Sequence, residues 1–161
     1  MPDHTLVLLR HAKSDWSGEE ADIARPLADR GRRQAPEAGR WLNASIELLD
    51  LAIVSPAARA RETWDLVAAE LDTPPPVRID ERVYASSDSQ LLTVVREVPD
   101  DLGTVVLVGH NPGIEELVSR LTSESTPMPT SAIAVITVTG GWTSVGHGSE
   151  VLRSSGRPPT S

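Results

Sequence analysis

The sequence predicts an α/β fold: a three-layer α/β/α sandwich with a mostly parallel central sheet. Aliphatic, β-prone runs alternate with stretches of helical length along most of the chain. This alternation is typical of βα units, which build a parallel sheet between two helical layers. The last strongly β-prone run is followed by Gly140-Gly141, a turn signal that predicts a C-terminal hairpin. We therefore expect the sheet to be mixed at one edge.

The parallel part of the sheet is predicted from short aliphatic strands, which cover residues 5–9, 51–54, 77–79 and 104–108. The predicted helices that follow them cover about 29–44, 56–71, 88–98 and 112–121. Ser55 is a favourable N-cap with Pro56 in the first turn, and Ser87 or Asp88 can cap the third helix. Pro36 lies inside the first predicted helix and should kink or delay it.

The C-terminal part is predicted to finish the sheet. Ala132–Val138 is the strongly β-prone run, the segment around Trp142–Val145 is its expected hairpin partner, and Glu150–Arg153 is a candidate edge strand. The chain of 161 residues is expected to form one domain over 1–153. Residues 154–161, rich in Ser, Gly and Pro, are expected to form a disordered tail.

Composition excludes several classes of function. The formal net charge of −8 argues against a nonspecific nucleic-acid binder, which needs a basic surface. The chain has no cysteine, so it offers neither disulfides nor thiolate ligands nor a cysteine nucleophile. No apolar run approaches the ~20 residues that cross a bilayer, and Met1–His4 lacks the features of a signal peptide. We expect a cytoplasmic protein with no membrane or nucleic-acid partner.

Three predicted strand-to-helix junctions carry unusual polar groups. They contain Arg10-His11, Arg59 after Ser55-Pro56, and His110 within Gly109–Gly113. The carboxyl ends of parallel strands meet at one edge of an open α/β sheet, where such folds place their ligands. Arginine offers a permanently charged, planar fork of donors that matches phosphate oxygens. The sequence therefore predicts a site for a phosphoryl group.

The predicted chemistry is phosphoryl transfer to a histidine. An imidazole beside two guanidinium groups resists protonation, because like charges disfavour the cationic ring. The neutral ring can attack phosphorus, and the arginines can stabilise charge on the equatorial oxygens. His4 and His147 have no spacing typical of metal ligands, so we expect no metal and no cofactor. Lys13 and Arg25 either enlarge the positive rim of the site or pair with nearby carboxylates.

Four segments together carry a family resemblance: 8–16 (LLRHAKSDW), 25–31 (RPLADRG), 55–63 (SPAARARET) and 108–113 (VGHNPG). They are similar, in this order, to motifs of the histidine phosphatase (phosphoglycerate-mutase-like) superfamily, and the likeness extends over about residues 5–138. The short chain and the His-Asn-Pro-Gly element resemble the SixA-type phosphohistidine phosphatase branch. The resemblance implies that His11 is the phosphorylated nucleophile and that Arg10 and Arg59 clamp the phosphate. It also implies that His110 contacts the phosphoryl group as a second catalytic imidazole, with Asn111 beside it as a substrate-binding residue.

The sequence departs from the family pattern at two positions. Ala12 stands where the superfamily usually has Gly; the methyl group is acceptable at negative φ and not at positive φ. Ser17 stands where an Asn often follows, and it is a candidate phosphate ligand with a shorter reach. Relatives often carry a general acid after the third strand, and Glu81 is the candidate here. The alternative is that Glu81 is a solvated loop carboxylate beside Arg82.

The resemblance and the residues together lead to one expected function with two alternatives. We expect a metal-independent phosphatase that works through a phosphohistidine on His11 and acts on protein phosphohistidine. A phosphohistidine needs less help from a general acid than an ester does, because imidazole leaves more readily than an alkoxide. The alternatives are hydrolysis of a small phosphomonoester and a catalytically silent module that binds phosphorylated partners.

Overall fold

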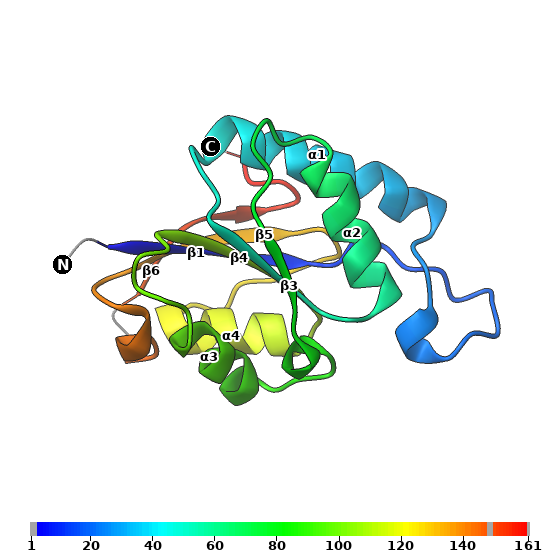
Figure 1. The fold of residues 1–161 in the computed structure, drawn as a ribbon. Coiled ribbons are helices and arrows are strands. Elements are labelled where there is room, and N and C mark those ends of the chain that lie inside the picture. The colour runs from blue at the N-terminus through cyan, green and yellow to red at the C-terminus, as the bar shows by residue number, and fades with distance from the viewer. Residues whose placement is uncertain (1–2, 148–149, 161) are drawn as a thin grey trace.

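In the computed structural model, which describes residues 3–147 and 150–160, a six-stranded sheet lies between two layers of helices (Figure 1). The strand order across the sheet is β3-β2-β4-β1-β5-β6. The strands are β1 (His4–Arg10), β2 (Leu51–Val54), β3 (Val77–Ile79), β4 (Thr104–Gly109), β5 (Ile133–Val138) and β6 (Val151–Gly156). The helices are α1 (Asp29–Ser45), α2 (Ala58–Ala68), α3 (Asp88–Arg96) and α4 (Gly113–Thr122). Short 3-10 turns form η1 (Asp22–Ala24), η2 (Glu81–Val83) and η3 (Trp142–Ser144).

The register of the sheet brings the predicted junctions to one edge. Strands β1, β2, β3 and β4 run parallel, with β1 against β4 and β2 between β4 and β3. Arg10, the last residue of β1, lies opposite Gly109, the last residue of β4. The residues that follow both strands therefore leave the sheet side by side. Beyond β1, β5 and β6 are antiparallel, which gives the mixed edge that the sequence predicts.

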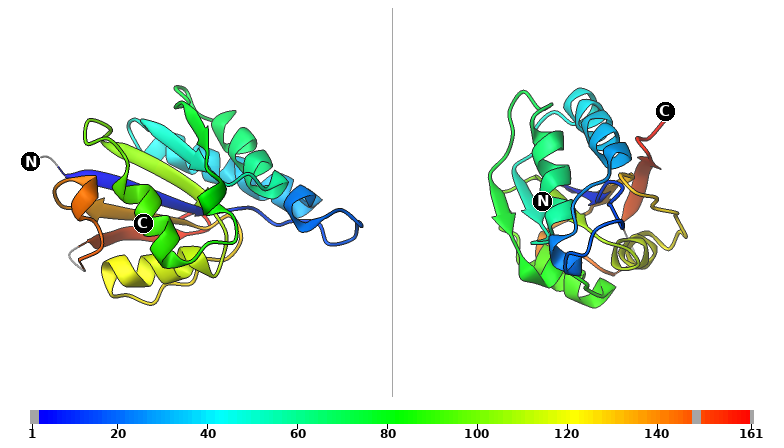
Figure 2. Two further views of the ribbon diagram at one scale, coloured as in Figure 1. Left: turned by 60° about the horizontal axis from the view of Figure 1, so that its bottom comes forward. Right: turned by 90° about the vertical axis from the view of Figure 1, so that its right-hand side faces the viewer.

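The helical layers bury opposite faces of the same strands. On β1, Leu6 and Leu8 contribute to the core beneath α3 and α4, whereas Val7 and Leu9 contribute to the core beneath α1 and α2. All four side chains are fully buried. Figures 1 and 2 show the two helix pairs on the two faces of the sheet. The sequence of β1 is continuously apolar over these residues because helices cover both faces of the strand.

Helix α2 begins later than the sequence predicts. Its first residue is Ala58 and its N-cap is Ala57, so the assignment of Ser55 as the N-cap is wrong. Ser55 lies in the connection, where its hydroxyl oxygen accepts a hydrogen bond from the Ala57 N–H at 3.2 Å. Helix α1 continues through Pro36, which neither delays its start nor ends it. The Ser87 cap of α3 is confirmed, and Gln90 completes a capping box with it.

The C-terminal hairpin has a different partner from the predicted one. Trp142–Ser144 forms η3 instead of a strand, because the Trp142 side chain is fully buried and its Nε1–H donates to the Leu102 carbonyl at 2.8 Å. The strand paired with β5 is β6, which runs to Gly156. The predicted disordered tail is therefore wrong for residues 154–156; Ser161 lies outside the described residues. Among the helices that the structure describes, none has the length and hydrophobicity to span a bilayer.

Candidate active site

His11 occupies the first position after β1, at the edge where the parallel strands end. Its ring is buried, and its Nδ1 atom lies 2.7 Å from the carbonyl oxygen of Ala12. A carbonyl only accepts hydrogen bonds, so the proton of the neutral ring is on Nδ1. The Nε2 atom consequently carries the free lone pair that a nucleophile needs.

The backbone after His11 is held by a buried threonine of α2. Thr63 Oγ1 accepts a hydrogen bond from the Ala12 N–H at 2.9 Å and donates to the Arg59 carbonyl at 2.6 Å. Ala12 itself is fully buried and is not one of the non-glycine residues that the structure describes with positive φ. The methyl group therefore needs no left-handed backbone, and the departure from Gly is compatible with an intact nucleophile loop.

Arginines from three segments surround this position. Arg10 ends β1, Arg59 lies in the first turn of α2, and Arg25 lies in the loop between β1 and α1. Their Nη atoms bind neighbouring protein oxygens, for example the Met128 carbonyl at 3.1 Å from Arg10 Nη1. The Nε–H of each of the three is buried without a hydrogen-bond partner among the described residues. Unpaired buried donors are costly, and the three arginines line one cavity, whose positive charge would attract an anionic ligand.

Arg25 belongs to the site and not merely to its rim. Its guanidinium is buried, donates to Ser14 Oγ, and lies 3.5 Å from the centre of the Trp16 ring. Trp16 itself is 71% exposed. This cation–π contact covers the solvent side of the guanidinium and holds it toward the cavity.

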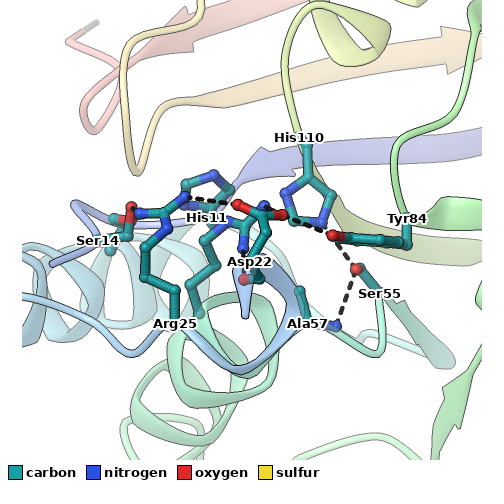
Figure 3. A network of polar contacts seen from close by, with 10 residues as sticks. His11, Ser14, Asp22, Arg25, Ser55, Ala57, Tyr84 and His110 are labelled. Carbon is teal, nitrogen blue, oxygen red and sulfur yellow. Dashed lines mark hydrogen bonds and ion pairs between the residues drawn. The ribbon is translucent and has the colours of Figure 1, made fainter. Parts of the chain in front are cut away.

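Asp22 also belongs to the site, although the sequence analysis predicted no role for it. Its Oδ2 atom accepts hydrogen bonds from Arg59 Nη2 at 3.1 Å and from the Tyr84 hydroxyl at 2.6 Å. Its Oδ1 atom forms an ion pair with Arg25 Nη2 at 3.4 Å, and its backbone carbonyl accepts from Arg59 Nη1 at 2.7 Å. Figure 3 shows the Asp22 carboxylate between the labelled side chains of Arg25 and Tyr84, close to both histidine rings.

His110 is the second buried imidazole. It follows β4, its ring centre lies 5.0 Å from that of His11, and its Nε2 atom is 2.7 Å from Ser55 Oγ. The Ser55 oxygen already accepts from Ala57, and its hydroxyl proton needs an acceptor, so we assign the ring proton of His110 to Nδ1. Among the described residues, Nδ1 has no hydrogen-bond partner. The site therefore contains a second kind of unpaired donor besides the arginine Nε–H groups.

Both imidazoles are neutral at physiological pH. Burial, with a smaller contribution from the charges of Arg59, Arg10 and Arg25, lowers the pKa of His11 to about 4. Burial, with a smaller contribution from His11 and Arg59, lowers the pKa of His110 to about 3. The His11 ring is therefore unprotonated without any neighbouring base, as a nucleophilic imidazole would need to be.

Two cavities meet at this cluster. The first, of about 250 Å³, is lined by the nucleophile and by the arginines. The second, of about 400 Å³, extends past Tyr84 and Ser86 to Pro112 and Glu116 on the other side. The side chains that line both cavities are those of Asp22, Arg59, His110 and Asn111. The arrangement gives a cationic compartment next to a wider and less charged one.

The remaining predicted site residues have different positions. Asn111 lines both cavities, but its Nδ2 donates to Glu115 and to the Met128 carbonyl, both at 2.9 Å. Ser17 is exposed and bonds Asp15, so the structure does not bring it to the arginines. Glu81 is exposed at the start of η2 and, within the described residues, lines neither cavity. The prediction of Glu81 as an acid in the site is not supported by this placement, and the neighbouring carboxylate, Asp80, pairs with Arg82.

Among the described residues, no group of three or more His, Asp or Glu side chains is arranged so that it could hold a metal ion. Sequence reasoning missed Asp22, Tyr84 and Ser55 as members of the site. Asp22 lies three residues before Arg25, and this i,i+3 spacing was the one available signal. Nothing local to the sequence indicated that Tyr84 would bind Asp22 or that Ser55 would bind His110, since both contacts span more than 50 residues.

Comparison with known proteins agrees with this geometry. The sequence profile of the histidine phosphatase superfamily (branch 1) matches residues 6–85. An uncharacterized protein of Mycobacterium tuberculosis is 36% identical over 157 residues, covering 89% of this chain and 96% of that protein. The structure named for phosphohistidine phosphatase SixA from Nakamurella multipartitia is 28% identical with a TM-score of 0.88, over 97% of this chain and 96% of that one. The corresponding SixA structure from Agrobacterium tumefaciens is 26% identical with a TM-score of 0.76, over 83% of this chain and 91% of that one. With its Arg-His strand end and its second imidazole in one cavity, the chain belongs to the histidine phosphatase superfamily.

Proposed function

We propose that the protein is a phosphohydrolase that carries a covalent phosphohistidine on His11 during turnover. The observation that carries the proposal is the pairing of a free His11 Nε2 lone pair with the guanidinium groups of Arg10, Arg25 and Arg59, which line the same cavity. A phosphoryl dianion in this cavity would pair with those cations and present its phosphorus to the nucleophile.

The proposed reaction has two steps. In the first, His11 Nε2 forms a bond to phosphorus while the bond to the leaving group breaks, and the leaving group departs into the second cavity with the bonding electrons. The arginines and the Nδ1–H of His110 stabilise the charge on the equatorial oxygens. In the second, water attacks the phosphohistidine and inorganic phosphate leaves. His11 then regains the same neutral tautomer, because the Ala12 carbonyl still holds the Nδ1 proton.

For the substrate, we propose a phosphohistidine on a protein. The absence of Glu81 from the cluster favours a leaving group that departs without a strong acid, and an imidazole meets this requirement better than an alkoxide. The wider cavity next to the nucleophile offers room for an imidazole and the backbone that carries it. The likeness to SixA structures, which are named for the same substrate class, supports this choice.

The test is a panel of substrates offered to the wild-type protein and to His11→Ala. The panel contains a phosphohistidine peptide, an aryl phosphate and small phosphate monoesters of sugars and nucleotides. We expect the peptide to have the highest kcat/KM and the variant to be inactive on every substrate. A higher kcat/KM on a small monoester would show that the protein is a phosphomonoesterase. No turnover of any substrate by the wild type would show that it is a catalytically silent binding module.

A further inference from the structure

Asp22 stands on the boundary between the cavity of the nucleophile and the cavity of the leaving group. It lines both, and its side chain is half exposed, so one side of the carboxylate faces the open space. Its other side is fixed by Arg59, Arg25 and Tyr84. A leaving group that departs from a phosphorus atom opposite His11 would pass this carboxylate.

The carboxylate stays ionised in this environment. The hydrogen bond from Tyr84 and those from Arg59 and Arg25 lower the pKa of Asp22 to about 2. At neutral pH, Asp22 can accept a hydrogen bond but has no proton to give. It therefore cannot serve as the acid that an alkoxide leaving group requires.

We propose that Asp22 selects phosphorylated imidazoles as substrates by accepting a hydrogen bond from the ring nitrogen that does not carry the phosphoryl group. The inference rests on the proposed phosphohydrolase function and names the residue that sets its leaving-group preference. An imidazole has a second nitrogen across the ring from the phosphorylated one, whereas the oxygen of a simple phosphate ester has no such donor.

The contact changes the chemistry of the leaving group. A neighbouring anion favours the protonated form of an imidazole, so Asp22 favours the phosphohistidine ring with N–H on its free nitrogen. When His11 Nε2 bonds to phosphorus and the old P–N bond breaks, the ring takes the bonding electrons and leaves as neutral imidazole. The proton on the other nitrogen stays where it was. No external acid takes part, which agrees with the exposed position of Glu81 outside both cavities in the described structure.

The surrounding charges support this selection. The groups that face Asp22 come from several elements: Arg25 from its own loop, Arg59 from α2, Tyr84 after η2, His110 after β4, and Glu116 from α4 across the second cavity. The arginines bind the dianion, while Asp22 and Glu116 leave the second cavity with acidic walls. A leaving group with its own negative charge is repelled there, and a protonated ring is attracted.

The decisive variant is Asp22→Asn, which keeps the shape and an oxygen for Arg59 but removes the charge. Its matched control is Glu19→Gln, which removes one charge from the same loop at an exposed position that lines neither of the described cavities. We expect Asp22→Asn to lower kcat/KM on a phosphohistidine peptide about 100-fold, the size of effect seen when one contact to a reacting group is lost. We expect kcat/KM on an aryl phosphate to fall about tenfold at most, because phenolate leaves without that contact and only the support of Arg59 is weakened. Glu19→Gln should leave both values unchanged.

A pH profile gives a second readout that a purely structural role would not move. In the wild type, kcat on the peptide should fall at high pH as the ring of the bound substrate loses its proton, and in Asp22→Asn this fall should begin at lower pH. Equal losses on both substrates, or an unmoved profile, would overturn the role of Asp22 and leave the phosphohydrolase function intact. A wild-type protein that hydrolyses the aryl phosphate but not the peptide would instead overturn the proposed substrate.

Discussion

At His11, one hydrogen bond decides which ring nitrogen is the nucleophile. The Ala12 carbonyl holds the proton on Nδ1, and burial with three nearby arginines keeps the ring from taking a second one. At His110, Ser55 has the corresponding role and leaves Nδ1–H as a donor. Different backbone and hydroxyl neighbours thereby suit two chemically identical side chains to the opposite roles that we propose for them, a nucleophile and a hydrogen-bond donor.

The protonation state of His11 is open to direct measurement. We expect nitrogen chemical shifts to show a neutral ring with the proton on Nδ1 from pH 8 down to pH 5, since the pKa is lowered to about 4. Long-range proton–nitrogen NMR spectra of the labelled protein report this tautomer, with the exposed His147 as the internal reference. A His11 ring that is half protonated near pH 6.5 would contradict the environment described for it.

Ala12→Gly tests whether the alanine is compatible with function. The methyl group is fully buried at a position without positive φ, so Gly gains nothing from its freedom. We expect the variant to lose about 1–2 kcal/mol of unfolding free energy through the lost methyl and the more flexible unfolded chain, with kcat/KM within a few-fold of wild type. A gain of tenfold or more in kcat/KM would show that the methyl strains the nucleophile loop.

At the scale of elements, α1 and α2 fix the loop that carries the nucleophile. The Lys13 carbonyl accepts from the Ala28 N–H at 2.9 Å, and the Lys13 N–H donates to Gln34 Oε1 at 2.9 Å. Gly31 brings the backbone of α1 against Lys13 so closely that a Cβ at this position would overlap its carbonyl oxygen. The first turns of α1 and the residues after His11 thus form one packed unit.

Gly31→Ala should disturb this unit. We expect a loss of about 1–3 kcal/mol, typical of overpacking, together with a fall in kcat as Lys13 and His11 move. Gly103→Ala is the matched control, because its Cβ would meet only Asp50 Oδ2 at an ordinary 3.6 Å. Urea unfolding and steady-state kinetics on both variants make the comparison; equal small effects would show that the contact at Gly31 relaxes freely.

The sequence predicts elements well where the signal is local. Aliphatic runs predicted the positions of β1, β2 and β3 within a residue or two, and the Arg-His pair marked the end of β1 where the cavity lies. It failed where a tertiary contact decides: Trp142 turns into the core, and β6 takes the place beside β5. In the site, Arg10, His11, Arg59 and His110 followed from strand ends and family likeness. The roles of Asp22 and Tyr84 depend on a loop folding back over the sheet edge, which no local pattern encodes.

At the scale of the whole molecule, the two buried imidazoles make stability depend on pH. The pKa values of His11 and His110 are about 4 and about 3 in the folded protein, below the ordinary value of 6.5. Between the lowered pKa values and 6.5, the unfolded chain therefore binds more protons than the folded protein. The free energy of unfolding is consequently highest above about pH 6.5 and falls as the pH decreases toward 4. The site contributes to acid instability through the same burial that keeps its nucleophile neutral.

We expect the free energy of unfolding to fall by about 5 kcal/mol between pH 7 and pH 4.5, from the two rings together. Urea titrations at both pH values measure it. In His11→Gln, which has no titrating ring at this position, the difference should be smaller. The same difference in the variant and the wild type would show that carboxylates, and not the imidazoles, cause the acid lability.

The proposed reaction places a phosphoryl group on His11 during turnover, and this phosphohistidine can be trapped by rapid quenching. Protein mixed with phosphorus-labelled phosphohistidine peptide is quenched within milliseconds and digested. We expect a label that survives alkali, is lost in acid, maps to the peptide containing His11 and is bound to Nε2. No trapped label during active turnover, or a label on any other residue, would contradict it.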